Sequence, residues 1–126
     1  MKTKEILDMY PELFGKDFDP KKTLMCFGFE VGPYWREIVI SYLPELSKIV
    51  KENNMDDFII IQIKEKFGRL SIYTRNPNDK INDIISQIAL ECSKTCDNCG
   101  SKENVLFRTD GWYRVHCDAC ENNLIY

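Results

Sequence analysis

Histidine is almost absent from this chain of 126 residues, because His116 is the only one. A zinc deaminase needs a His-x-Glu element before a Pro-Cys-x2-Cys element, but the chain has no His-x-Glu and Thr95 precedes Cys96. An HNH nuclease needs several histidines for its catalytic metal and general base. A Gly-rich phosphate loop, a nucleophile elbow and a convincing carboxylate pair are also missing. We therefore expect a protein that is not an enzyme, with a metal-dependent nuclease as the alternative.

Long hydrophobic runs are missing as well. No apolar run approaches the roughly 18 residues that a membrane span needs, and the N-terminus MKTKEILDMY lacks the apolar segment of a signal peptide. We expect no membrane partner and a cytoplasmic location. A reducing cytosol favours cysteines as metal ligands over disulfides. A disulfide framework or a redox Cys-x2-Cys site is the alternative use of the cysteines.

Positive charge is not in excess, since the formal net charge is −3. Residues 96–126 carry three basic and five acidic side chains. A finger that binds nucleic acid is normally basic, because neutralised phosphates supply much of the affinity. The charge therefore argues against binding of a nucleic-acid duplex, but not against binding of a small nucleotide in a pocket.

Cysteine, in contrast, is plentiful, and four of the six cysteines form two Cys-x2-Cys pairs. The pairs are Cys96 with Cys99 and Cys117 with Cys120, and the linker between them is long enough to fold as a hairpin. Four thiolates fill a tetrahedral site, so we predict one structural Zn²⁺ with no open position for water or substrate. The unit is a treble clef if the second pair begins a helix and a zinc ribbon if it does not. We favour the treble clef.

Three further residues with reactive side chains receive structural interpretations. Cys26 and Cys92 lie in apolar surroundings, where buried and inert thiols are expected. His116 directly precedes a ligand cysteine, so it can replace a ligand or donate a hydrogen bond to a thiolate. We expect it instead to be a surface residue at the end of a strand.

The hydrophobic pattern predicts an α+β fold, with helices packed on a β-hairpin and followed by the four-cysteine zinc finger. We divide the chain into an α+β domain, residues 1–94, and a rigidly attached finger, residues 95–126. Thr3 is expected to cap a first helix that Pro11 interrupts or restarts, and Pro44 to kink or break a helix opened by Gly32-Pro33. The remaining expected elements are a loop with a short extended piece at 15–32, strands at 57–65 and 69–75, a helix through 81–92, a hairpin of 105–108 and 112–116, and a terminal helical turn at 118–125.

The hairpin of residues 57–75 is predicted to have two different faces. Ile59, Ile61 and Ile63 are expected to point toward the helices, together with Leu70 and Ile72. The other face is then basic and polar. As candidate residues for binding an anionic partner we take Lys64, Lys66, Arg69, Tyr73 and Arg75, together with Trp112. An ordinary solvated sheet face is the alternative.

Three segments carry a resemblance to a known family. They are CFGFEVGPYW at 26–35, QIKEKFGRLSIYT at 62–74, and TCDNCG followed by GWYRVHCDAC within 95–120. The chain resembles a family of small, mostly uncharacterised bacteriophage and prophage proteins with a KEKFG hairpin and a C-terminal four-cysteine zinc finger. Tyr34 and Ser71 depart from the family pattern, which places glycine and arginine there, and the missing arginine weakens an anion site.

The resemblance implies a dispensable phage gene product, and such products often bind a host protein or inhibit a defence system. We therefore expect a non-enzymatic, zinc-stabilised phage accessory protein that binds a host macromolecule and inhibits a bacterial defence system. The alternative is a protein that binds or sequesters nucleic acid or a nucleotide through the basic face of residues 57–75. The oligomeric state stays open, because an exposed hairpin edge can pair with a second copy.

Overall fold

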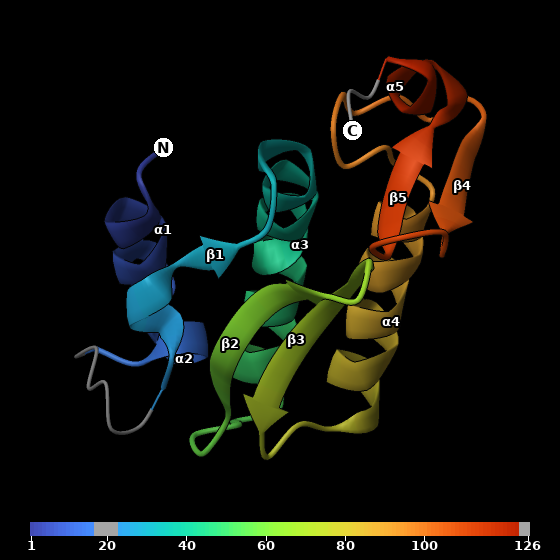
Figure 1. Cartoon of the computed structure of the whole chain (residues 1–126). Helices are drawn as coiled ribbons and strands as arrows, with labels where there is room; N and C mark the ends of the chain where they lie inside the picture. The colour runs from blue at the N-terminus through green and yellow to red at the C-terminus, as the bar shows by residue number, and fades with distance from the viewer. Residues whose placement is uncertain (17–22, 124–126) are drawn as a thin grey trace.

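The structure, a computed structural model, describes residues 1–16 and 23–123 and has the predicted α+β architecture (Figure 1). Residues 17–22 of the expected loop and residues 124–126 of the expected terminal turn lie outside the described residues. The elements are α1 (Thr3–Met9), α2 (Pro11–Phe14), the 3-10 turn η1 (Met25–Phe27), β1 (Phe29–Glu30), α3 (Pro33–Glu52), β2 (Ile59–Lys66), β3 (Arg69–Arg75), α4 (Asp79–Ser93), β4 (Val105–Arg108), β5 (Arg114–Cys117) and α5 (Asp118–Asn122).

One sheet of three strands organises the first part of the chain. β2 pairs antiparallel with β3, and the two-residue β1 pairs parallel with β2 on its other side. The helices α3 and α4 lie behind this sheet in Figure 1. The largest fully buried side chains of the core include Trp35, Phe14, Leu43, Leu46, Ile60, Ile63, Ile81 and Ile88.

The helix starts follow local capping chemistry, with one exception. Asn78 caps α4, because its side chain accepts a hydrogen bond of 2.9 Å from the Ile81 N–H. Pro33 occupies the first turn of α3, as predicted. Thr3 is not a cap: it lies inside α1, and its hydroxyl faces the Arg36 guanidinium at 3.5 Å. The predicted restart of the helix at Pro11 is confirmed.

The predicted break at Pro44 is wrong, since α3 runs without interruption for 20 residues. Proline removes one backbone donor and crowds the preceding turn. Pro44 lies on the exposed side of α3, whereas Leu43 and Leu46 beside it are buried in the core. Packing of this apolar face on both sides of Pro44 outweighs the local cost, because tertiary burial supplies most of the stability of a helix.

The predicted alternation along β2 is wrong for two of its residues. Ile60 and Ile63 are buried, whereas Ile59 and Ile61 are only half-buried. The register shifts between Ile60 and Gln62, which is the signature of a β-bulge. One extra residue in a strand reverses the alternation beyond it, so Ile60 and Ile63 share the inner face although three positions separate them.

The β2–β3 turn is also where the C-terminal part of the chain packs. Phe67 and Gly68 both have positive φ, 54° and 78°, as a two-residue type I′ turn requires. A Cβ on Gly68 would lie 2.7 Å from the Phe107 ring and 2.9 Å from the backbone N of Arg114. The β4–β5 hairpin therefore contacts the turn through a position that only glycine fits, and its Val115 joins the main core.

The cysteine-containing loop after α4 packs on the start of α3. The Trp35 indole Nε1–H donates a hydrogen bond of 3.0 Å to the carbonyl oxygen of Thr95. Gly100 lies so close to the Tyr34 ring that a Cβ there would overlap it. Residues 26–35, 62–74 and 95–120, the segments that carry the family resemblance, thus meet in one region of the fold.

Substitution of Gly68 tests the contact between the two hairpins. Gly68→Ala should destabilise the protein by about 2–5 kcal/mol, because it adds a steric clash to a backbone conformation that disfavours a Cβ. Gly111→Ala is the matched control: Gly111 has φ of 86° but nothing within 4 Å of its added Cβ. It should cost only about 1–2 kcal/mol. Urea unfolding measures both variants, and equal losses would contradict the contact.

Candidate metal centre and adjoining pocket

The four cysteines of the two Cys-x2-Cys pairs meet in space. Cys96 and Cys99 follow α4, Cys117 ends β5, and Cys120 lies within α5. Their sulfur atoms all lie within 4.8 Å of one another, and the Cys99 and Cys117 sulfurs are 3.6 Å apart. Four thiolates this close together can hold one metal ion. The second pair lies at the start of a helix, because Cys117 is the N-cap of α5.

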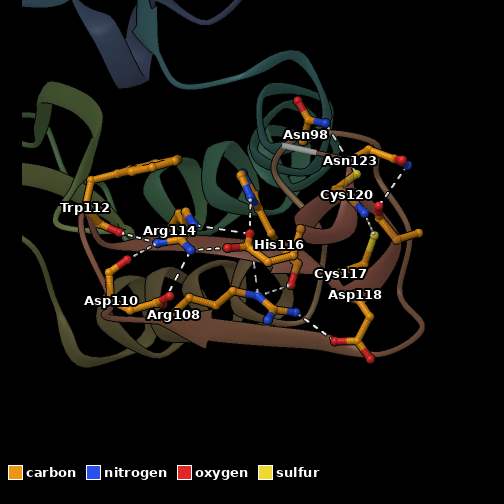
Figure 2. Close-up of polar contacts among 12 residues, drawn as sticks. Asn98, Arg108, Asp110, Trp112, Arg114, His116, Cys117, Asp118, Cys120 and Asn123 are labelled. Carbon is orange, nitrogen blue, oxygen red and sulfur yellow. Dashed lines mark hydrogen bonds and ion pairs between the residues drawn. The ribbon is translucent and has the colours of Figure 1, made fainter. Parts of the chain in front are cut away.

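Hydrogen-bond donors favour the ionised form of one sulfur of the cluster, that of Cys96. Burial raises the pKa of the Cys96 thiol, but hydrogen bonds from backbone N–H groups, including that of Cys117, lower it more, to about 6. The Asn98 side-chain amide donates to the Cys120 sulfur at 3.3 Å, as Figure 2 shows. The Asn98 amide lowers the pKa of the Cys120 thiol, but burial and the neighbouring thiols raise it more, to about 12. Metals bind the thiolate and not the thiol, so the donors assist metal binding most clearly at Cys96.

The other two cysteines behave differently from each other. Cys92 is fully buried on the inner face of α4, and burial raises its pKa to about 12, as expected of an inert thiol. Cys26 is exposed, so the prediction that it is buried is wrong. The 3-10 turn η1 places Met25 in the core and leaves the next side chain pointing outward.

An ionic network ties β5 to α5, which together carry the second ligand pair. The Arg114 side chain is only 3% exposed. It forms an ion pair with Glu121 and donates to the carbonyl oxygens of Asp110 and Trp112 at 2.7 and 2.8 Å (Figure 2). Hydrogen bonding to Arg114 lowers the pKa of Glu121 to about 2, which keeps its carboxylate ionised.

His116 is buried, so its expected place on the surface is wrong. Its Nδ1 lies 3.0 Å from a carboxylate oxygen of Glu121, and it is not a member of the cluster of four cysteines. The short helix α5 brings Glu121 over β5. The contact with this carboxylate offsets the cost of burying the imidazole.

A pocket of about 310 Å³ lies beside this network. Its walls come from three separate parts of the chain: Trp35 of α3, Glu65 and the turn after β2, and Asp97 together with residues 112–116. None of Trp35, Glu65 and Asp97 is among the binding residues predicted from the sequence. The signal that could have found them is that each lies in one of the three segments that carry the family resemblance.

Asp97 is the least compensated charged group of this pocket. Its Oδ1 is buried and has no hydrogen-bond partner among the described residues. It lies against Gly32, the N-cap of α3, where a Cβ would be 2.6 Å away. Burial raises the pKa of Asp97 and the Glu65 carboxylate raises it further, whereas His116 lowers it. Glu65 itself accepts a hydrogen bond from the Gly68 N–H.

The predicted basic face exists, but Trp112 is not part of it. Cross-strand pairing aligns Gln62 with Tyr73, Lys64 with Ser71 and Lys66 with Arg69, and Arg75 follows Tyr73 by two positions along β3. Directly paired residues share a face of the sheet, so the five hairpin residues selected from the sequence lie together. Trp112 lies on the β4–β5 hairpin, where the Arg114 guanidinium is 4.3 Å from the centre of its ring.

Aromatic rings accompany three cations of this face. The Nζ atoms of Lys64 and Lys66 lie 5.8 and 5.9 Å from the ring centres of Tyr73 and Phe67. The Arg69 guanidinium is 4.4 Å from the ring centre of Phe107. Among the described residues, none of these three cations forms an ion pair with a carboxylate.

Comparison of the chain with protein-family models, with curated proteins and with solved structures finds no match. Within the described residues, no helix combines the length and the apolar character that crossing a bilayer requires.

Loss of one ligand tests whether the cysteine cluster supports the C-terminal part of the fold. Cys117→Ser should abolish metal binding and open the chain to trypsin after Arg108 and Arg114, because structural zinc contributes on the order of 10 kcal/mol in small fingers. Cys26→Ser is the control, since Cys26 is exposed and lies outside the cluster. Native mass spectrometry and limited proteolysis measure both effects. Unchanged protease resistance of the Cys117→Ser protein would show that the site is not structural.

Proposed function

We propose that this chain is a non-enzymatic binding protein of phage origin, stabilised by one structural Zn²⁺, that binds a host macromolecule and thereby inhibits a bacterial defence system. Phage origin and defence inhibition come from the family resemblance. The observation that carries the binding function is the state of Phe67. Its ring is 68% exposed at the tip of the β2–β3 turn, and its backbone is left-handed.

Phe67 is a poor choice for its position on structural grounds alone. The first position of a type I′ turn favours asparagine, aspartate or glycine, and a bulky residue with positive φ is strained. The exposed ring contributes little to the core. Backbone strain that does not stabilise the fold is found mainly at functional sites. We therefore assign Phe67 to contact with a partner.

The surroundings of Phe67 have the composition of a protein interface. Its ring packs edge-on against Tyr113 with 6.1 Å between ring centres, and Tyr113 in turn contacts Phe107 at 5.9 Å. All three rings are exposed, as is Trp112. Contiguous exposed aromatic side chains are unusual on a monomer and are enriched at the centres of protein interfaces.

In the proposed function, the metal ion holds this aromatic surface in position. Four cysteine ligands suit Zn²⁺ and close its coordination sphere, so the ion acts structurally. The second ligand pair begins a helix, which favours a treble clef over a zinc ribbon. The ion holds the β4–β5 hairpin, and with it Phe107, Trp112 and Tyr113, against the β2–β3 turn.

Phe67→Asn separates binding from folding. Asparagine creates an Asn-Gly sequence, which suits a type I′ turn, so the stability should be unchanged or higher by about 1 kcal/mol. Recovery of the host partner from lysate should fall strongly relative to the unmodified protein. Leu90→Gln, which removes an exposed apolar side chain outside the cluster of Phe67, Tyr113 and Phe107, should leave recovery unchanged. Equal recovery of the same partner by Phe67→Asn and Leu90→Gln would contradict the proposal.

A second candidate function is the binding or sequestering of nucleic acid or a nucleotide through the basic face. The supporting observation is that Lys64, Lys66 and Arg69 lie over aromatic rings and have no carboxylate partner among the described residues. Proteins that bind single strands combine such cations with rings on which bases stack.

Salt dependence tests this second candidate. The affinity for a fluorescent oligothymidylate should fall as the salt concentration rises, with a logarithmic slope of about −0.7 for each phosphate contact. Lys66→Gln should weaken binding and reduce the slope. Lys48→Gln should change neither, because Lys48 lies on α3 beside Glu52 at 4.0 Å. An affinity that does not respond to salt would exclude binding dominated by phosphates.

A further inference from the structure

We infer that the pocket between α3, the β2–β3 turn and the β4–β5 hairpin binds a positively charged side chain, arginine or lysine, of a protein partner. The inference rests on the proposed binding function and names the group that the partner inserts. The residues that would hold it are the carboxylates Glu65 and Asp97 and the exposed indole of Trp112.

The charges around the pocket leave a negative excess. Neither Glu65 nor Asp97 forms an ion pair with a cation among the described residues. Arg114 also lines the pocket, but its charge is taken up by the ion pair with Glu121. His116 is bonded to the same carboxylate. A ligand that enters therefore meets two carboxylates whose charge the protein does not neutralise.

The buried position of the Asp97 carboxylate makes the lack of a nearby cation energetically costly. A carboxylate oxygen without a hydrogen-bond partner, such as its Oδ1, is costly to remove from water. The position of Asp97 beside the first turn of the 20-residue α3 favours a negative charge there, because helix N-termini carry a partial positive charge. A cation in the pocket would supply the opposite charge that the described part of the fold does not.

The walls and the size of the pocket select the shape of the ligand. Three exposed aromatic residues, Phe67, Trp112 and Tyr113, border it, and aromatic rings attract cations, most strongly where water is excluded. A volume of about 310 Å³ is at the lower limit of the roughly 300–1,000 Å³ typical of ligand sites. It suits one side chain rather than a dinucleotide. The exposed Phe67 at its rim places the pocket inside the proposed protein interface, which favours a side chain of a partner over a free amine.

Tryptophan fluorescence of the full-length, metal-loaded protein reports directly on this site, because both tryptophans of the chain line the pocket. The probe is N-acetyl-arginine methylamide, and N-acetyl-citrulline methylamide is its neutral analogue of nearly the same shape. The arginine probe should change the emission in a saturable manner and bind at least about tenfold more tightly than the citrulline probe. Equal responses to the two probes, or no response to either, would overturn the inference.

Two isosteric variants test whether the carboxylates of the pocket bind the arginine probe. Glu65→Gln and Asp97→Asn should each weaken the arginine probe by about tenfold or more, whereas Asp83→Asn on the exposed side of α4 should have no effect. Circular dichroism and zinc content establish that each variant is folded. If Asp97→Asn does not fold, the Glu65→Gln variant and the comparison with the citrulline probe still show whether the pocket selects a cation. Undiminished binding of the arginine probe by folded Glu65→Gln would overturn the inference.

The same variants distinguish this inference from the broader proposal. If Phe67→Asn loses the host partner while Glu65→Gln retains it with full affinity, the protein is a binding protein but the pocket does not take the partner's cation. If Phe67→Asn and Glu65→Gln both retain the partner, the proposed binding surface fails as well. Loss of the partner by both, with selective loss of the arginine probe by Glu65→Gln, supports the inference.

Discussion

The convergence of four sulfur atoms within 4.8 Å is the constraint on which the C-terminal part of this structure depends. Ionised thiolates repel one another at such distances, and a bound metal ion would offset this repulsion. Such an ion would join the loop after α4 to the start of α5 and so restrict where the β4–β5 hairpin between them can lie. The Arg114–Glu121 ion pair then fixes that hairpin to α5. Metal coordination, as proposed, and this nearly buried ion pair would thus take the place of a separate hydrophobic core, which residues 95–123 are too few to form.

Several features of this arrangement could be predicted from the sequence because they depend on local chemistry. The spacing of the cysteines, the apolar repeat of α4 and the Asn78 cap each act over a few residues. The tight turn between β2 and β3 is equally local, although it has two residues, Phe67 and Gly68, and not the three that lie between the predicted strands. The basic face followed from the alternation of β3, which has no bulge of its own to disturb it.

The features that could not be predicted depend on partners distant in the chain. The bulge in β2, the continuity of α3 across Pro44 and the burial of His116 are each decided by what packs against them. The pocket is the strongest example, because Trp35, Glu65 and Asp97 are separated by about thirty residues each along the chain. An isolated glutamate or aspartate gives no signal of its own, and only the fold shows that two of them lie beside the same cavity without a cation.

The wide spacing of the pocket residues also orders events during synthesis. Contacts between distant residues form late, because the chain between them must first be made and its closure entropy overcome. A nascent chain that ends before residue 116 has its α3, its three-stranded sheet and its α4, but not the second pair of sulfurs that brings the remaining wall into place. In the proposed function, the pocket is therefore completed only once the four sulfurs have captured their ion. The supply of metal in the cell, and not only the rate of translation, would then set how soon a new copy becomes competent to bind.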